Sequence, residues 1–220
     1  MGRDPWAPLA LLTYALAFSL AYLRLDAGLG ALLLFGTVQL VMIGVGMAGG
    51  ERPTSGELLG VALAIGGLGI LTVPGASAPS PVGAALMVLA GVGWAVYSLR
   101  GRRADEPIAA NARSFVLTAP VAVLVAGLAI AMGEEGAGST RGIGLAVLSG
   151  AVASGLGYAF WYAALAGLTA TRAAIVQLVV PVLAALGSVI FLAETVTSRL
   201  LLGGAAVLLG IALALLMRRR

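Results

Sequence analysis

The sequence predicts an all-α, polytopic membrane helix bundle of about eight transmembrane helices, built as inverted repeats. Composition and an internal duplication lead to this fold class. Of the 220 residues, 60% are hydrophobic and only 10% are charged, whereas soluble domains carry about 25% charged residues. The mean hydropathy is +1.07. The apolar residues form runs long enough to cross a hydrocarbon layer of roughly 30 Å as helices, so the protein is expected to lie in a membrane.

Eight spans are expected in chain order, separated by short connections rich in glycine, proline and charge. They cover residues 7–23, 30–47, 57–73, 81–99, 114–132, 142–165, 173–192 and 200–217. The first span could be mistaken for a secretory signal, but Arg24 and Asp26 follow it and no small-x-small cleavage site is present. No connection is long enough to hold a separate soluble domain.

The arginines predict the orientation of the chain. All 13 basic residues are arginine. If Met1 is cytoplasmic, ten of them fall on the cytoplasmic side, and only Arg24, Arg141 and Arg199 fall outside. Cytoplasmic segments of membrane proteins carry an excess of positive charge. We therefore expect a multi-pass protein of the plasma membrane with both termini in the cytoplasm.

One pattern occurs twice. Glu-x-x-Thr-Ser-x-x-Leu-Leu-Gly begins at Glu51 and again at Glu194, an offset of 143 residues, and the match continues to Gly67 and Gly210. A match of this length indicates an internal duplication. Five expected crossings separate the copies, so they should lie in opposite orientations, as in many secondary transporters. Both glutamates precede a helix start and are expected to be structural.

Small residues are dense where helices are expected to touch. The spacings Gly56-x-x-x-Gly60-x-x-x-Ala64 and Gly150-x-x-x-Ser154 allow close approach of helix backbones. Such spacings indicate packing and carry no chemistry.

The second copy resembles the EamA-type carriers of the drug/metabolite transporter superfamily. The resemblance rests on residues 177–187, Glu194 and Leu201-Leu-Gly203, with a weaker copy at Thr37-Val-Gln39-Leu, Glu51 and Leu58-Leu-Gly60. It implies a ten-helix carrier of small organic metabolites or amino-acid-like solutes, often an exporter, with two five-helix repeats around a central cavity. Pro181 corresponds to Val38 in the first copy, which is expected to be straighter there.

The two repeats are expected to be unequal. Residues 81–220 contain the five spans of a complete second repeat, and residues 1–80 contain three spans of an incomplete first repeat. We therefore expect a shortened form of a ten-helix carrier that lacks the opening pair of helices.

Polar and aromatic side chains inside the expected spans are few, and they are the candidate solute contacts. An amide in hydrocarbon needs partners, so Gln39 and Gln177 should face the bundle or a wet cavity. Tyr14, Trp94 and Tyr158 combine a polar tip with a flat ring that can stack on an organic solute. These five residues are the predicted substrate-binding set. For the glutamines, a hydrogen bond that only holds helices together carries equal weight.

Trp161, Arg172 and Pro181 are secondary candidates. Trp161 shares the sixth span with Tyr162, and Tyr162 and Tyr97 are expected in an interfacial aromatic belt. Arg172 could attract an anionic group at the inner mouth, although such an arginine more often extends to lipid headgroups. Pro181 frees a carbonyl one turn earlier, which indicates either an irregular, cavity-lining segment or a tolerated kink.

The residue types that are missing narrow the function. The chain has no cysteine and no histidine, and no carboxylate falls in the middle of an expected span. This counts against an intramembrane enzyme, a metal site and an intramembrane proton relay, and no catalytic residue, metal or cofactor is predicted. No soluble basic face suits nucleic acid.

The expected function is a carrier that moves a small organic solute by alternating access, with the solute and the lipid bilayer as its partners. A passive facilitator or exchanger and a non-transporting, truncated membrane fragment are the alternatives. Assembly as a homodimer stays open.

Overall fold

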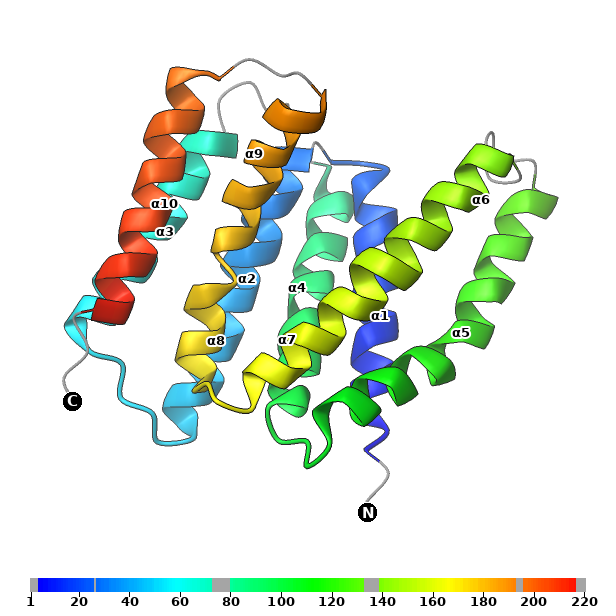
Figure 1. The fold of residues 1–220 in the computed structure, drawn as a ribbon, viewed down its shortest axis with the longest axis horizontal. Coiled ribbons are helices and arrows are strands. Elements are labelled where there is room, and N and C mark those ends of the chain that lie inside the picture. The colour runs from blue at the N-terminus through cyan, green and yellow to red at the C-terminus, as the bar shows by residue number, and fades with distance from the viewer. Residues whose placement is uncertain (1–3, 26, 73–79, 133–138, 193–195, 217–220) are drawn as a thin grey trace. The chain divides into compact units, whose positions relative to one another are not determined.

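The computed structural model describes residues 4–25, 27–72, 80–132, 139–192 and 196–216. Figure 1 shows the fold as a ribbon. The contacts within the chain divide it into two units. Unit 1 comprises Met1–Leu12 and Val96–Gly167, and unit 2 comprises Thr13–Ala95 and Leu168–Arg220. Each unit is described separately below. Glu194 lies outside the described residues.

The described residues form helices and contain no strand. The elements are α1 (Trp6–Tyr22), α2 (Ala27–Ala48), α3 (Ser55–Thr72), α4 (Pro81–Gly101), α5 (Pro107–Ala131), α6 (Thr140–Val147), the π-helix η1 (Leu148–Leu156), α7 (Gly157–Leu165), α8 (Ala170–Val176), α9 (Val179–Leu192) and α10 (Ser198–Leu216). Long apolar helical segments, able to cross a membrane by length and composition, are Gly30–Ala48, Pro81–Gly101, Pro107–Leu128 and Thr140–Leu165. Shorter apolar segments are Trp6–Tyr22, Ser55–Ile70, Ala170–Leu183 and Leu201–Leu216. The all-α, polytopic membrane bundle is thereby confirmed.

Helix α5 begins seven residues earlier than the sequence predicted. Pro107 occupies its first turn, where a missing N–H leaves no hydrogen bond unmade and the fixed φ suits a helix. The polar residues Asn111 and Arg113 made this stretch look like a connection, but they lie on the helix. The sixth span also differs from expectation, because its middle, Leu148–Leu156, is a π-helix.

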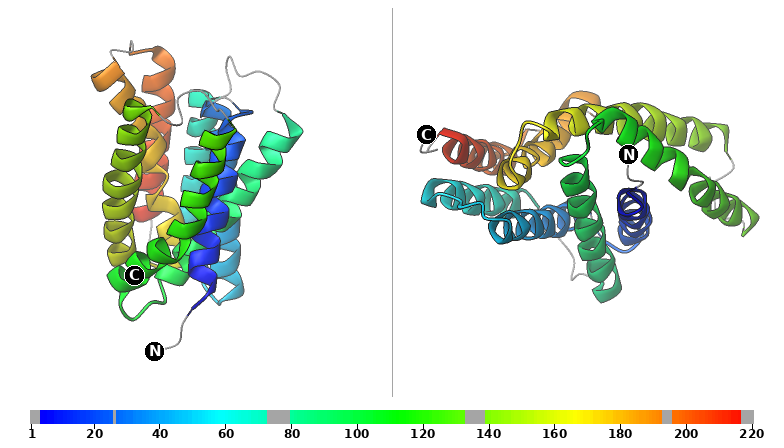
Figure 2. Two further views of the ribbon diagram at one scale, coloured as in Figure 1. Left: turned by 90° about the vertical axis from the view of Figure 1, so that its right-hand side faces the viewer. Right: turned by 90° about the horizontal axis from the view of Figure 1, so that it is seen from below.

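Helices α3 and α10 carry the two copies of the duplicated pattern, and they pack together in unit 2 (Figure 2). A Cβ on Gly60 would overlap the Gly210 carbonyl, and a Cβ on Gly67 would lie 2.8 Å from the Gly203 carbonyl. The lower-numbered glycine of each helix thus faces the higher-numbered glycine of the other, so the helices are antiparallel. The duplicated helices run in opposite directions, as the inverted repeat requires.

The close contact expected at Gly60 is therefore present, whereas the one expected at Gly150 is not. A Cβ on Gly150 would meet nothing within 4 Å among the described residues. The spacing Gly150-x-x-x-Ser154 lies in the π-helix, whose geometry differs from the one that places residues i and i+4 on one face.

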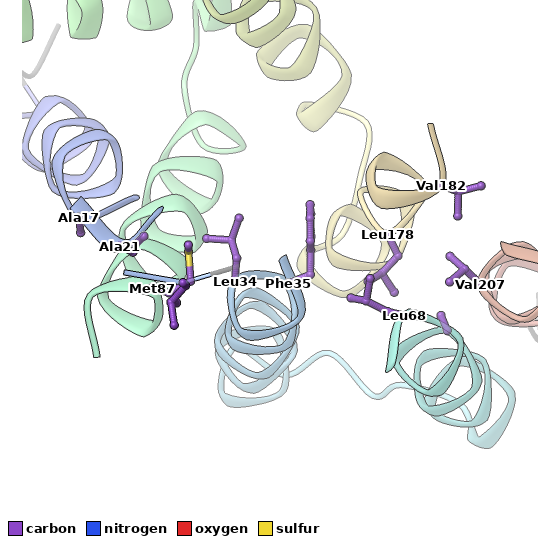
Figure 3. Close-up of a cluster of buried hydrophobic side chains, with 12 residues drawn as sticks. Ala17, Ala21, Leu34, Phe35, Leu68, Met87, Leu178, Val182 and Val207 are labelled. Carbon is purple, nitrogen blue, oxygen red and sulfur yellow. The ribbon is translucent and has the colours of Figure 1, made fainter. Parts of the chain in front are cut away.

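A core cluster of unit 2 is apolar and draws on α1, α2, α3, α4, α9 and α10 (Figure 3). Its labelled members are Ala17, Ala21, Leu34, Phe35, Leu68, Met87, Leu178, Val182 and Val207. Within the seventh span, α8 packs against α2 and α9 packs against α10.

Candidate functional site

The seventh span is broken between α8 and α9. Proline has no N–H to donate and its ring conflicts with the carbonyl four residues earlier, which for Pro181 is the carbonyl of Gln177. That carbonyl accepts instead from the N–H of Val180 at 3.1 Å, and the N–H of Leu178 donates to Ile175 at 3.1 Å. Both bonds have three-residue spacing. The segment beside Pro181 is therefore irregular, which both a kink and a cavity-lining segment would require.

The matching helix of the first copy is continuous. Helix α2 runs from Ala27 to Ala48 without a break, through Val38 at the position that corresponds to Pro181. The first copy is therefore continuous where the second is broken.

Gln39 of α2 hydrogen bonds to the broken segment. Its Nε2 donates to the carbonyl of Ala174 at 2.5 Å. In a continuous α-helix that carbonyl would accept from Leu178, which is bonded to Ile175 instead. The side chain of Gln39 is 1% exposed, and its Oε1 meets no donor among the described residues. An unpaired buried acceptor is costly, so among the described residues this site is one hydrogen-bond donor short.

Gln177 lies at the break and contacts two helices. Its Oε1 accepts from the indole Nε1–H of Trp94 at 2.7 Å. Its Nε2 faces the sulfur of Met42 at 3.2 Å, and a thioether is a weak acceptor. The amide N–H of Gln177 is therefore poorly satisfied although the residue is only 4% exposed.

Aromatic rings of α1 pack against Trp94 and against one another. The ring centroids of Tyr14 and Trp94 are 5.0 Å apart, those of Tyr14 and Phe18 are 5.3 Å apart, and those of Phe18 and Tyr22 are 4.7 Å apart. These spacings are typical of aromatic pairs. The three rings of α1 form a row that leads to Trp94, which in turn contacts Gln177.

The structure thus brings four of the five predicted binding residues together in unit 2. We call Tyr14, Gln39, Trp94 and Gln177 the glutamine–tryptophan site. The hydrogen bonds and ring contacts described above involve neutral groups only. Pro181 shapes the break, and Arg172 lies half-buried on α8, where its backbone N–H donates to the Oγ1 of Thr169 at 3.2 Å.

Tyr158 and Trp161 belong to unit 1. The ring of Tyr158 lies 6.3 Å from that of Tyr97 and 5.8 Å from that of Phe115. The Nε1–H of Trp161 donates to the Oγ of Ser98 at 3.0 Å. Here the two residues help to pack α4, α5 and α7.

Tyr97 and Tyr162 were expected in an interfacial belt, but both are fully buried. The hydroxyl of Tyr97 donates to Oδ1 of Asn111 at 2.6 Å, and the hydroxyl of Tyr162 donates to the carbonyl of Tyr97 at 2.9 Å. Asn111 supplies the acceptor that makes burial of Tyr97 tolerable. The belt interpretation is wrong for this pair.

Unit 1 contains a cleft of about 640 Å³. It lies between the start of α1 and the α4–α5 connection, and its charged lining residues are Asp4, Arg100, Arg103, Asp105, Glu106 and Arg113. Arg100 and Asp4 are 3.5 Å apart and about 40% exposed, so their ion pair contributes little. The acidic and basic charges of the cleft balance. No group of three His, Cys, Asp or Glu able to hold a metal ion occurs among the described residues.

Comparison with known proteins identifies the family. Residues 81–216 match the EamA-like transporter family. This chain belongs to that family. It is 50% identical over 215 residues to the Pseudomonas aeruginosa protein PA1977, covering 97% of this chain and 74% of that protein. It is 30% identical over 165 residues to an uncharacterized transporter of Archaeoglobus fulgidus, covering 73% and 58%.

A solved structure shares the fold of this EamA-like chain. The TM-score is 0.78 at 20% sequence identity, with 99% of this chain and 80% of the other covered. Together with the apolar helices, the family match makes this chain a multi-pass membrane transporter.

Sequence reasoning missed the Met42 contact of the glutamine–tryptophan site and the partner of Glu51 in this EamA-like chain. Met42 looked like any apolar core residue, and nothing in the sequence marked its sulfur as an acceptor. Glu51 was expected to be structural at the start of the helix that follows it, and Glu57 caps that helix, since its Oε2 accepts from the N–H of Thr54 at 2.7 Å. Glu51 instead accepts from the first residues of α8. The sequence signal for this contact was a carboxylate directly after Gly50, the glycine that terminates α2.

Proposed function

We propose that this EamA-like chain carries a small organic metabolite or an amino-acid-like solute by alternating access, and that the solute binds at the glutamine–tryptophan site. One observation carries the proposal: Gln39 and Gln177 converge with Trp94 on a helix break, and each glutamine keeps a poorly satisfied polar atom. Broken helices with buried polar groups form the substrate sites of many transporters.

The chemistry of the site supports a solute without net charge. The polar groups are two amides, an indole and a phenol, and a charge taken out of water needs a counter-charge or several hydrogen bonds. An uncharged or zwitterionic solute with a flat part would stack on Trp94 and Tyr14. It would accept from Nε2 of Gln177 and donate to Oε1 of Gln39.

The repeat architecture supports alternating access. The duplicated helices α3 and α10 are antiparallel, and inverted copies can exchange conformations so that one site opens to either side. Residues 1–80 and 81–220 are proposed as the two copies. The arginine distribution supports cytoplasmic termini in the plasma membrane, and the family resemblance supports export.

A passive facilitator or exchanger is the second candidate. It is favoured by the neutral composition of the glutamine–tryptophan site, which offers no group to carry a coupling proton. Collapse of the proton gradient by a protonophore distinguishes passive flux from proton-driven export. Facilitated diffusion would be unchanged, whereas proton-driven export would stop.

Flux through the purified chain tests the proposal. Proteoliposomes would be loaded with labelled neutral, zwitterionic and charged metabolites. We expect saturable flux of a neutral or zwitterionic solute, and its loss in Gln177→Ala. Leu40→Ala is the matched control, because Leu40 is next to Gln39 and 77% exposed. Absence of flux for every class, or normal flux in Gln177→Ala, would refute this site.

A further inference from the structure

Glu51 joins the end of α2 to the start of α8. We propose that this junction is a latch that regulates opening of the glutamine–tryptophan site. The inference rests on the proposed function, because it assigns a regulator to the same site. We call Glu51, Ala170 and Thr171 the Glu51 latch.

Both oxygens of the carboxylate are engaged by α8. Oε1 accepts from the backbone N–H of Ala170 at 2.8 Å. Oε2 accepts from the backbone N–H of Thr171 at 3.0 Å and from its Oγ1–H at 2.9 Å. The first N–H groups of a helix lack partners within the helix, and hydrogen bonds to a carboxylate are stronger than those between neutral groups.

The end of α2 is shaped to deliver this carboxylate. The N–H of Glu51 donates to Gly46 at 2.9 Å and that of Gly50 donates to Met47 at 3.0 Å, which is the Schellman pattern that ends a helix. Gly50 has a φ of +92°, a conformation that favours glycine. A Cβ on Gly46 would lie 2.7 Å from Oε2 of Glu51. Two glycines therefore leave room for the carboxylate to turn back towards α8.

Helices α2 and α8 pack against each other, and among the described residues the latch and two further polar side-chain links connect α2 with α8 or its C-cap. The other two are Gln39 to Ala174 and Met42 to Gln177, and both belong to the glutamine–tryptophan site. Helix α8 has seven residues, so the latch is about 10 Å from the break along the helix axis.

The three links make opening conditional on the solute. A solute that accepts from Nε2 of Gln177 replaces the link to Met42. The Gln39–Ala174 bond and the latch then remain as the polar links between α8 and α2. Removal of the latch should therefore favour the open state even without solute. Loss of one charge-assisted hydrogen bond shifts such an equilibrium by about tenfold or more.

The absence of cysteine makes opening measurable. Ala173 on α8 is 0% exposed, so an Ala173→Cys reporter in the full-length chain is protected from a water-soluble maleimide while α8 is held. We expect Glu51→Gln to raise the labelling rate about tenfold, and Glu51→Ala to raise it further. Gly46→Ala should act in the same direction, because it displaces the carboxylate and leaves Glu51 in place.

Two controls separate opening from loss of the fold. Glu57→Gln removes a carboxylate that caps only α3 and should leave labelling unchanged. Ala90 on α4 is 0% exposed, so an Ala90→Cys reporter should stay protected in every variant. Unchanged labelling at position 173 in Glu51→Ala would overturn the latch, and so would equal labelling at position 90, because Glu51 would then support the whole fold.

The readout needs no solute, so the two proposals can fail separately. Faster labelling in Glu51→Gln without flux of any solute would keep the latch and refute the carrier. Normal flux with unchanged labelling would keep the carrier and refute the latch.

Discussion

Gln177 makes its two side-chain contacts with partners of unequal strength. The indole N–H of Trp94 is a good donor at 2.7 Å, whereas the Met42 sulfur, 3.2 Å away, is a weak acceptor. The Gln177 N–H is therefore the group that a solute can take over with the least loss. Gln39 complements it, because its Oε1 is buried without a donor among the described residues.

Trp94→Phe tests the stronger of these contacts. The change keeps a ring against Tyr14 and removes the donor to Gln177. We expect the free energy of unfolding to fall by about 1–3 kcal/mol, because a buried acceptor is left unsatisfied. Titration with SDS measures this. Trp6→Phe is the control, since Trp6 is 56% exposed, and equal stability of the two variants would contradict the contact.

At the residue scale, the sequence identified the polar members of the site and missed the apolar one. Gln39, Trp94 and Gln177 were selected because amides and indoles in hydrocarbon need partners. Met42 gave no such signal. Tyr158 has the same chemistry as Tyr14, and the sequence could not show that it belongs to the other unit.

The glycine contacts between helices α3 and α10 are symmetric with respect to the duplication. Gly60 and Gly67 of the first copy correspond to Gly203 and Gly210 of the second. In the structure Gly60 meets Gly210, and Gly67 meets Gly203. The helix pair therefore has an approximate two-fold axis between its members.

Gly67→Ala should separate this pair. Its Cβ would lie 2.8 Å from Ala206 and from the backbone of Gly203 and Val207, and overpacking of this kind lowers stability by about 1–3 kcal/mol. Gly66→Ala on the same helix meets nothing within 4 Å among the described residues. It should raise stability by up to about 1 kcal/mol through helix propensity. SDS titration measures the stability of both variants. Stability changes of the same sign in the two variants would contradict this packing.

Pro181→Ala should restore a continuous helix between α8 and α9. An N–H at position 181 can bond to the Gln177 carbonyl, so the span is expected to become more stable while solute flux falls about tenfold. Pro120→Ala is the control, because Pro120 is inside α5 and exposed. It should raise stability without loss of flux. If Pro181→Ala transports normally, the break is not needed for function.

At the element scale, apolar runs predicted the spans and a single proline predicted the break. The early start of α5 was hidden by polar residues that the fold places on a helix. The π-helix of the sixth span has no signal in the sequence that we recognise. The pairing of α3 with α10 required the structure, since small-residue spacings mark a contact face without naming its partner.

For the whole molecule, the antiparallel α3 and α10 predict that the loops before them lie on opposite sides of the membrane. Single cysteines at Pro53 and Val196, placed in this cysteine-free chain, should be labelled by an impermeant reagent from opposite faces. The arginine distribution predicts that Pro53 is the cytoplasmic one of the two. Labelling of both positions from one face would contradict the inverted repeat.

Sided labelling of a Met42→Cys reporter tests alternating access at the glutamine–tryptophan site most directly. Met42 is 0% exposed and contacts Gln177, so a thiol there reports on the site itself. In sealed vesicles of each orientation, we expect slow labelling from both faces, slowed further by the transported solute. The Glu51→Gln change should raise labelling from one face and lower it from the other. Labelling from one face only, unaffected by solute while transport continues, would show that the solute takes another path.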